Sequence, residues 1–427
     1  MLELFLNNED KGSVIRMKNL LFAKGGISMN MKRKLLFGMT IFAFLLPFFP
    51  GGLGIAGAAQ PIKIGFLGPY VGVSAKYGTD LKNGFMQALG EVNYKVAGRD
   101  IVFIPEDDEL KPEVGLVKAR KLVEKDQVHI LGGVISSAVA YALRDYVITK
   151  KVPLVICCAG ATQLTQQQRS PYIFRVSFAN GQQDAAGGWY AYTKKGARKY
   201  VVIGSDYAAG HEKGAGFMKT FKLMGGEIVE EIYPPLGTSD YAPYVAKIAN
   251  WVGKADHLWT FFQGSDAVRF VTQYAEYGLK EKIPIFGEAG LTDSANLPAQ
   301  RDAALGIEGY LQYFETVDTP ENKRFFKEYR EKYKDIPGSL SEGGYVGGKA
   351  VVKALQAIGG KIESQEAFLK ALKVVKFEAP RGPFRFDDHQ NVVEPVHICR
   401  VEKRGGEYVN VVIDTIPDVD QYWMPKK

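Results

Sequence analysis

The stretch Pro61-Ile62-Lys63-Ile64-Gly65-Phe66-Leu67-Gly68-Pro69 reads as a short buried strand that ends in a glycine-containing loop. Similar apolar runs alternate with helical patterns along most of the chain. They predict strands at 101–104, 130–134, 283–286 and 408–412 and long helices over 322–334 and 341–358, and a helical stripe through Ala140 and Tyr146 follows the strand at 130–134. This β-α-β alternation predicts parallel sheets with helices on both faces, an α/β fold. Two runs of it, separated near 174–188, predict two similar Rossmann-like lobes.

An export signal precedes the first predicted strand. Met31-Lys32-Arg33-Lys34 is basic, 35–49 is uncharged and mostly apolar, and Ala56-Gly57-Ala58-Ala59 is small. These are the three parts of a secretory signal, so we expect residues 1–59 to be an upstream extension plus a cleaved signal peptide. An uncleaved membrane anchor is the alternative. No cysteine precedes Cys157, so we expect a periplasmic protein without a lipid anchor.

Charge and cysteine content exclude several classes of protein. Cleavage after Ala59 leaves 368 of the 427 residues, enough for two lobes. Residues 1–59 carry seven Lys/Arg and three Asp/Glu, so their removal lowers the net charge from +7 to +3. No polybasic block remains, which argues against nucleic acid or anionic lipid as a partner. The three cysteines are too few for a disulfide scaffold.

The strand-to-helix joins are the candidate binding loops, because ligands of open α/β sheets bind beyond the carboxyl ends of the strands. The join at 132–137 puts two hydroxyls at a helix start, whose free N–H groups suit a carboxylate. A simple helix cap is the other interpretation of Ser136. The polar, small or aromatic residues that we single out at the joins are Ser136, Ser137, Gly160, Ala161, Thr162, Tyr207, Ala209, Gln263 and Glu288.

Catalytic and cofactor motifs are not found in the sequence. His211-Glu212 lacks the second histidine of H-E-x-x-H, and Gly264-Ser265 is not framed as a G-x-S-x-G elbow. The first strand is followed by neither G-x-G-x-x-G nor a phosphate loop. Asp107-Asp108-Glu109 is more typical of a loop or helix cap than of a metal cluster. We therefore expect no catalytic residue, metal or cofactor, and a binding protein rather than an enzyme.

Several short segments, in this order, make the chain resemble the Leu/Ile/Val-binding family of periplasmic solute-binding proteins of ABC importers. They are I-K-I-G-F-L-G-P at 62–69, A-K-Y-G at 75–78, N-G-F at 83–85, E-D-D at 106–108, G-G-V-I-S-S at 132–137, A-G-A-T-Q-L-T at 159–165, D-Y-A-A-G at 206–210 and G-Y-V-G-G-K-A at 344–350. The resemblance covers about 61–388. It implies the type I periplasmic binding fold, with three crossover strands joining lobe 1 (60–178 and 312–391) to lobe 2 (179–311 and 392–427).

The resemblance also implies a function. A monomer would capture a small carboxylate ligand between the lobes by hinge closure and deliver it to permease subunits of an ABC transporter. Ser136, the Gly160 region and Thr162 would hold the ligand's carboxylate, while Tyr70 and Tyr77 would face the pocket from lobe 1. A sensory or regulatory protein of the same fold is an alternative function. An exported hydrolase is a weaker one, because it needs a nucleophile–base pair.

Two departures from the family pattern concern the ligand. Ala209 stands where an aromatic residue usually precedes the glycine of the D-Y-A-x-G loop, and Gln263 lies where amino-acid binders often have an aromatic side chain. The acid that pairs with a ligand ammonium is shifted by one, because Ala289 holds its expected place next to Glu288. A buried ammonium without a partner is costly. This departure indicates an aromatic or aliphatic acid without an α-amine as the ligand, and an apolar amino acid is the alternative that stays open.

Overall fold

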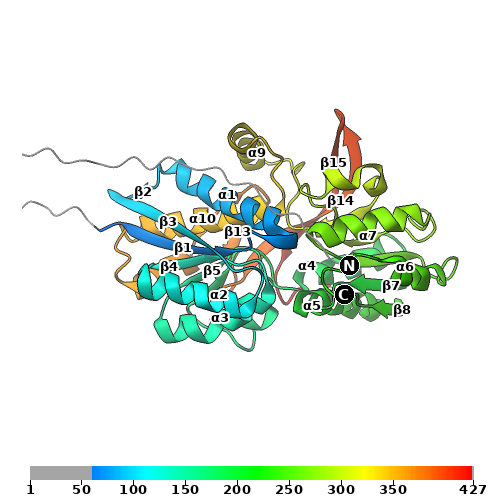
Figure 1. Cartoon of the computed structure of the whole chain (residues 1–427), viewed down its shortest axis with the longest axis horizontal. Coiled ribbons are helices and arrows are strands. Elements are labelled where there is room, and N and C mark those ends of the chain that lie inside the picture. The colour runs from blue at the N-terminus through cyan, green and yellow to red at the C-terminus, as the bar shows by residue number, and fades with distance from the viewer. Residues whose placement is uncertain (1–59, 426–427) are drawn as a thin grey trace, which may run out of the picture. The chain divides into compact units, whose positions relative to one another are not determined.

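The computed structural model describes residues 60–425. The predicted signal peptide and upstream extension, 1–59, lie outside the described residues. Within them the chain forms three hydrogen-bonded sheets with helices packed on both faces, which is the predicted α/β architecture (Figure 1). Two of the three are joined by a single bridge and are described together as the second sheet.

The first sheet begins with the strand that opens the described chain. Its order is β2(Lys95–Val96), β3(Arg99–Asp107), β1(Ile62–Gly68), β4(Ile130–Gly133), β5(Leu154–Ile156) and β6(Ile173–Arg175). Neighbouring strands are parallel except β2 and β3, which are antiparallel. Because the strands are parallel, their carboxyl ends meet at one edge of the sheet.

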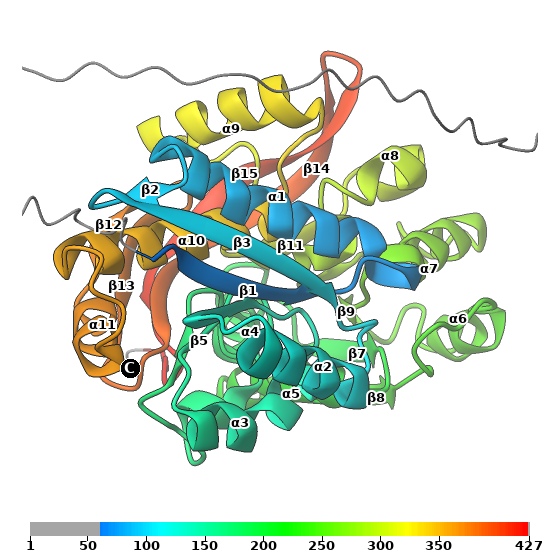
Figure 2. The same cartoon turned by 60° about the vertical axis from the view of Figure 1, so that its left-hand side comes forward.

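Side chains of β1 alternate between two helical layers, as the strand period of two requires. Phe66 packs against Phe85 with ring centroids 5.1 Å apart, whereas Leu67 packs in the cluster of Val139 and Leu143. The helices are α1(Ala75–Glu91), α10(Ser339–Ala357) and α11(Gln365–Lys373), and, on the other face, α2(Pro112–Arg120) and α3(Ser137–Lys150). Figure 2 shows α1 above β1 and β3, with α2 and α3 below.

The second sheet is assembled from parallel and antiparallel strands. Its parallel part has the order β8(Glu227–Ile232), β7(Lys199–Gly204) and β9(His257–Phe261). A bridge from Leu258 to Ile285 connects it to a mixed part. That part runs β10(Phe286–Glu288), β11(Glu308–Leu311), β14(Val392–Arg404), β13(Gly382–Phe386) and β12(Lys376–Ala379), and β15(Glu407–Val419) pairs with β14.

Helices also cover both faces of the second sheet. Val202 of β7 packs with Phe217 and Phe221, and its neighbour Val201 packs with Val245 and Phe270. The first face is covered by α4(Gln182–Thr193) and α5(Ala208–Leu223), the second by α6(Ala242–Ala249) and α7(Gly264–Glu276). The remaining helices are α8(Leu297–Gln300) and α9(Pro320–Tyr333), with the short turns η1(Gly72–Ser74), η2(Lys121–Lys125), η3(Thr162–Thr165), η4(Ala289–Thr292) and η5(Arg301–Ala304).

The chain passes between the two sheets three times: after β6, after β11 and along β14. Arg381, which is fully buried, ties two of these passages together. Its Nη1 donates to the carbonyls of Val176 and Ser177, both at 3.2 Å, and pairs with Glu394 of β14. Its Nη2 pairs with Glu342 of α10. A buried ionic network centred on Arg381 therefore holds together the chain segments that pass between the sheets.

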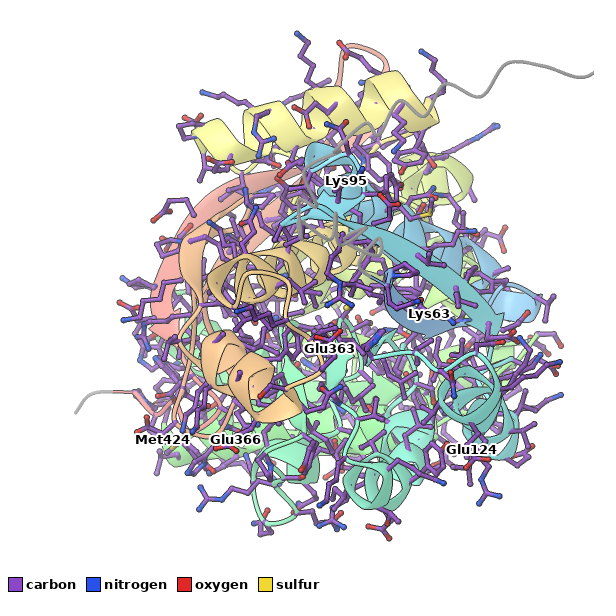
Figure 3. All side chains as sticks on the ribbon, turned by 90° about the vertical axis from the view of Figure 1, so that its left-hand side faces the viewer. Lys63, Lys95, Glu124, Glu363, Glu366 and Met424 are labelled. Carbon is purple, nitrogen blue, oxygen red and sulfur yellow. The ribbon has the colours of Figure 1, made fainter. Side chains whose placement is uncertain are left out.

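Some strands differ in extent from their sequence-based predictions, and two of them lie near the candidate site or in the first sheet. A strand was expected over 283–286, but β10 starts only at Phe286, because Pro284 has no N–H and contributes only its carbonyl to Leu258. The strand expected over 101–104 extends over Arg99–Asp107. Its end residues are polar, so a search for apolar runs finds only its centre. The charged side chains of Lys95, Glu124 and Glu366 are exposed, and Figure 3 labels them.

Candidate functional site

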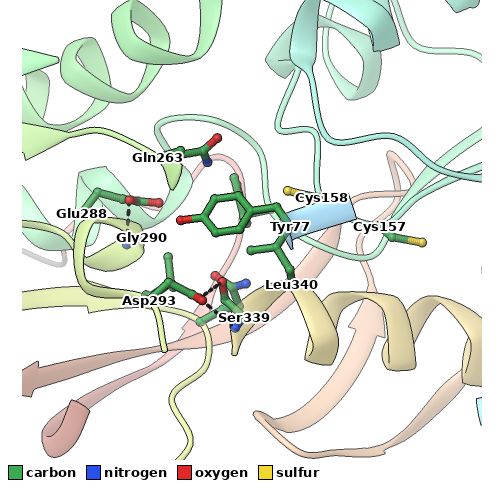
Figure 4. Close-up of a pocket in the computed structure, with 12 residues that line it drawn as sticks. Tyr77, Cys157, Cys158, Gln263, Glu288, Gly290, Asp293, Ser339 and Leu340 are labelled. Carbon is green, nitrogen blue, oxygen red and sulfur yellow. Dashed lines mark hydrogen bonds between the residues drawn. The ribbon is translucent and has the colours of Figure 1, made fainter. Parts of the chain in front are cut away.

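A small cavity of about 20 Å³ lies between the two sheets, within about 370 Å³ of space that includes its opening to solvent. Its walls come from α1, from the loop after β5, from the passages after β6 and β11, from the ends of β9 and β10, and from the start of α10 (Figure 4). The lining residues are Tyr77, Cys157, Cys158, Phe178, Gln263, Glu288, Gly290, Asp293, Leu311, Gln312, Ser339 and Leu340.

Tyr77 places a hydroxyl in this cavity from the first turn of α1. The helix lies close to the loop after β1 because residue 78 is glycine, whose Cβ would lie 1.7 Å from the carbonyl oxygen of Pro69. The Tyr77 hydroxyl oxygen accepts hydrogen bonds from Gly264 N at 3.0 Å and from Asn296 Nδ2 at 2.8 Å. Both contacts use the oxygen, so among the described residues the phenolic proton has no acceptor. Burial raises the pKa of Tyr77 well above its ordinary value, which keeps that proton in place.

Glu288 forms a buried ion pair with a lysine of α5. Lys213 Nζ lies 3.1 Å from Glu288 Oε1 and 3.9 Å from Asp184 Oδ2, and both Lys213 and Glu288 are at most 2 % exposed. The second carboxylate oxygen, Oε2, accepts from Gly290 N at 2.9 Å. Burial alone would lower the pKa of Lys213, but the carboxylates of Glu288 and Asp184 raise it overall. The charge of Glu288 is therefore already compensated by the protein.

Asp293 is the other acid of the cavity, and it has hydrogen-bond donors but no cation. Its Oδ2 accepts from the Ser339 amide at 3.0 Å and from the Ser339 hydroxyl at 2.6 Å, and its Oδ1 accepts from Ala295 N at 3.1 Å. None of the cations in residues 60–425 lies within salt-bridge distance of it. Asp293 therefore gives this end of the cavity a negative charge that favours a hydrogen-bond donor on a ligand.

Three of the residues singled out in the sequence line the cavity, namely Tyr77, Gln263 and Glu288. Ser136 instead caps α3, where its Oγ accepts from Val139 N at 3.4 Å. Ser137 Oγ accepts from Asn180 Nδ2 at 3.1 Å. These two hydroxyls thus have partners within the protein.

The loop after β5 also has partners within the protein. The carbonyls of Gly160 and Ala161 accept from Arg175 Nη1 at 3.1 and 2.7 Å. Thr162 donates through its amide and its hydroxyl to Glu212, at 3.3 and 2.9 Å. The resemblance implies that these two groups of Thr162 bind a ligand carboxylate. In the structure they instead contact the carboxylate of Glu212 on α5.

The remaining predicted residues lie outside the cavity lining. The Tyr70 ring has Lys82 Nζ 4.9 Å from its centroid, and its buried hydroxyl has no partner among the described residues. Tyr207 packs near Phe261, with ring centroids 6.1 Å apart. Ala209 is buried in the apolar cluster of α4, α5 and the second sheet.

Sequence reasoning missed several lining residues. Phe178, Leu311 and Gln312 belong to the passages between the sheets, which no local motif distinguishes from ordinary loops. Asp293 and Ser339 are 46 residues apart and meet only through the tertiary fold. The one available signal was the polar run after Glu288, in which Thr292 and Asp293 follow the predicted strand.

Comparison with known proteins gives consistent results. The model of the family described as "Periplasmic binding protein" matches residues 61–407. Leu/Ile/Val-binding protein homolog 6 of Brucella melitensis is 30% identical over 368 residues, covering 84% of this chain and 93% of the relative. An ABC transporter substrate-binding protein from Sphaerobacter thermophilus is 40% identical, with a TM-score of 0.81, covering 84% of this chain and 99% of that one.

A solved solute-binding protein of an ABC transporter from Rhodopseudomonas palustris BisB5, in complex with 3,4-dihydroxybenzoic acid, is 32% identical. It has a TM-score of 0.80, and the match covers 85% of this chain and 99% of that one. Fold, cavity and relatives define a solute-binding protein of the ABC-transporter class, which is not a class of enzymes. The chain belongs to the periplasmic binding protein family. None of the helices within 60–425 is long and apolar enough to cross a membrane.

Proposed function

We propose that this protein captures a small aromatic carboxylate of the hydroxybenzoate type in the cavity between its two sheets. The observation that carries the proposal is the Tyr77 hydroxyl, a buried donor in the cavity whose proton is unused. A hydrogen bond from a neutral donor to an anion is charge-assisted and strong. A neutral hydroxyl therefore stabilises a carboxylate there without adding another charge.

Other lining residues support a ligand with an aromatic body. Phe178, Leu311 and Leu340 supply apolar surface. Gln312 Oε1 accepts from Gln183 Nε2 at 2.7 Å, which leaves the Gln312 amide hydrogens as donors, and Gln263 adds a second side-chain amide. A pocket with apolar walls and a few polar groups is typical of small-molecule sites.

Asp293 supports a hydroxyl on the ring. A phenolic hydroxyl can donate to its carboxylate, whereas unsubstituted benzoate brings only a second negative charge. Relatives bear on the same class of ligand, because solved solute-binding proteins that are 29 to 32% identical carry 3,4-dihydroxybenzoic acid, benzoate and p-hydroxybenzoic acid. We expect 4-hydroxybenzoate to bind more tightly than benzoate.

A thermal-shift panel tests this proposal. It compares benzoate, 4-hydroxybenzoate and 3,4-dihydroxybenzoate with L-leucine, L-isoleucine and L-phenylalanine at one pH and ionic strength. We expect the melting temperature to rise with the hydroxybenzoates, because a ligand that binds only the folded state stabilises it. A rise with the amino acids alone would reject the proposal.

An apolar amino acid is the second candidate ligand. Asp293 favours it, because a carboxylate without a cation can hold an ammonium as well as a phenol. The relatives named as Leu/Ile/Val-binding proteins bear on it too. The panel separates the two candidates directly.

The rest of the proposal concerns delivery. We infer that the protein is exported by a signal peptide cleaved after Ala59, acts as a periplasmic monomer, closes on its ligand by a hinge motion and docks on permease subunits. The proposed lobes are 60–178 with 312–391, and 179–311 with 392–427. The buried clusters support this division, because Phe384 of β13 packs in the cluster of Phe66 and Phe85, although β13 is hydrogen-bonded to β14. A decrease in the radius of gyration on adding ligand, at unchanged mass, would test closure and oligomeric state together.

A further inference from the structure

The carboxylate of Glu212 on α5 is held by four donors. Tyr141 Oη donates to Oε1 at 2.7 Å. Thr162 N at 3.3 Å and Asn180 Nδ2 at 2.8 Å donate to Oε2. The single proton of the Thr162 hydroxyl lies between Oε2 at 2.9 Å and the carbonyl of Asn180 at 3.0 Å. We call these four donors the Thr162 donor set. Such a convergence of neutral donors would hold any carboxylate that reached it.

A buried cation lies behind this donor set. Arg175 is fully buried, and its guanidinium donates to the carbonyls of Gly160 and Ala161 and to Asn391 Oδ1 at 2.7 Å. Among the ion pairs of residues 60–425, none involves Arg175. Its positive charge therefore favours an anion on the donor set in front of it.

Lys213, the next residue of α5, forms an ion pair with Glu288, one of the two acids that line the cavity. Lys213 directs its ammonium to Glu288 and lies 4.2 Å from the centroid of the Phe178 ring, which lines the cavity. Adjacent residues of one helix thus supply a carboxylate to the Thr162 donor set and an ammonium to Glu288. Those are the two charged groups of an α-amino acid.

We propose that Glu212 and Lys213 are specificity determinants that make the protein reject α-amino acids. The carboxylate of Glu212 fills the Thr162 donor set, which could otherwise hold a ligand carboxylate. The ammonium of Lys213 pairs with Glu288, which could otherwise hold a ligand ammonium. A ligand ammonium near Glu288 would be repelled by the like charge of Lys213. The carboxylate of the same ligand could bind the Thr162 donor set only by displacing Glu212. A ligand carboxylate without an α-amine can bind the Tyr77 hydroxyl and requires neither the Thr162 donor set nor Glu288. The inference rests on the proposed function, whose ligand class it narrows.

Chemical rescue tests the role of Glu212. Glu212→Ala empties a donor set that is half-buried and can be reached from solvent. We expect sodium acetate, compared with sodium chloride at equal ionic strength, to raise the melting temperature of Glu212→Ala and not that of the wild type. Glu276→Gln, an exposed acid of α7, is the matched control and should behave like the wild type. An equal effect of acetate on all three proteins would overturn the inference.

Ligand selection tests the pair. We expect wild-type protein to bind L-leucine at least roughly tenfold more weakly than 4-hydroxybenzoate, and Glu212→Ala combined with Lys213→Met to narrow that ratio tenfold or more. Lys222→Met, exposed on α5, is the control for the lysine. Wild-type protein that binds L-leucine as tightly as 4-hydroxybenzoate overturns the inference.

The two tests separate the inference from the proposed function. Because Lys213 is buried, its variant can fail to fold, and the acetate comparison on Glu212→Ala then decides alone. If the wild type binds no hydroxybenzoate, the proposed function fails, while acetate rescue confined to Glu212→Ala still supports the role of Glu212.

Discussion

At the scale of single residues, the unused proton of Tyr77 is the feature on which ligand binding depends most. Tyr77→Phe should weaken 4-hydroxybenzoate binding by about 1.5–3 kcal/mol, the usual value of a hydrogen bond to a charged group. Isothermal titration measures the change. Tyr200→Phe is the matched control, because the Tyr200 hydroxyl is buried without a partner among the described residues. Equal affinities of the two variants would remove Tyr77 from the site.

Asp108 gives a prediction for pH dependence. It is fully buried, one oxygen accepts from Leu110 N at 2.9 Å, and the other has no partner within 60–425. Burial raises its pKa from 3.8 to about 6. The folded protein thus binds this proton more tightly than the unfolded chain, so its contribution to stability is complete below about pH 4 and is lost as the pH rises through about 6.

The variant Asp108→Asn should remove this dependence. The loss amounts to about 3 kcal/mol between these pH values, at about 1.4 kcal/mol for each pKa unit. Urea unfolding of wild type and variant at several pH values measures it. Asp100→Asn, at an exposed position on β3, the strand that ends just before Asp108, should keep the wild-type slope. An unchanged slope in Asp108→Asn would show that this carboxyl does not titrate as described.

Individual site residues were only partly predictable from the sequence. Gln263 lies just beyond the end of β9 and Glu288 is the last residue of β10, so the rule for parallel sheets located them. The partner of Glu288 was not predictable, because Lys213 reaches it from a helix 75 residues earlier. Thr162 was found as a donor, but only the tertiary fold shows that Glu212 accepts from it.

At the scale of secondary-structure elements, the contact between α1 and α10 requires small residues. A Cβ on Gly84 would lie 1.8 Å from the carbonyl oxygen of Ser341. Gly84→Ala should therefore destabilise the protein by at least about 1–3 kcal/mol through overpacking. Gly90→Ala on the same helix meets only Lys332 Nζ at 3.9 Å and should stabilise it by roughly 0.5–1 kcal/mol. Denaturant unfolding measures both, and opposite signs are the expected result.

Elements with a strong apolar period were the predictable ones. The helices expected over 322–334 and 341–358 are α9 and α10 to within about two residues. β15 was expected over 408–412 but extends over Glu407–Val419. It pairs along the length of β14, and its outer residues are polar and include Pro417, so only the partner strand reveals its full extent.

At the scale of the whole molecule, the buried Arg381 network connects the two sheets. Arg381→Met leaves Glu342 and Glu394 buried without their cation and should cost about 3–5 kcal/mol. Arg385→Met, whose exposed partner is Asp418, should cost at most about 1 kcal/mol. Thermal or urea unfolding compares the two variants. A similar small loss in both would mean that the network contributes little to joining the sheets.

The most direct test of the account is a crystal structure of the protein with 4-hydroxybenzoate. We predict the ring in the cavity, the ligand carboxylate within hydrogen-bond distance of the Tyr77 hydroxyl, and Glu212 still bound to Thr162. A ligand carboxylate on Thr162 with Glu212 displaced, or a ligand outside the cavity, would contradict it.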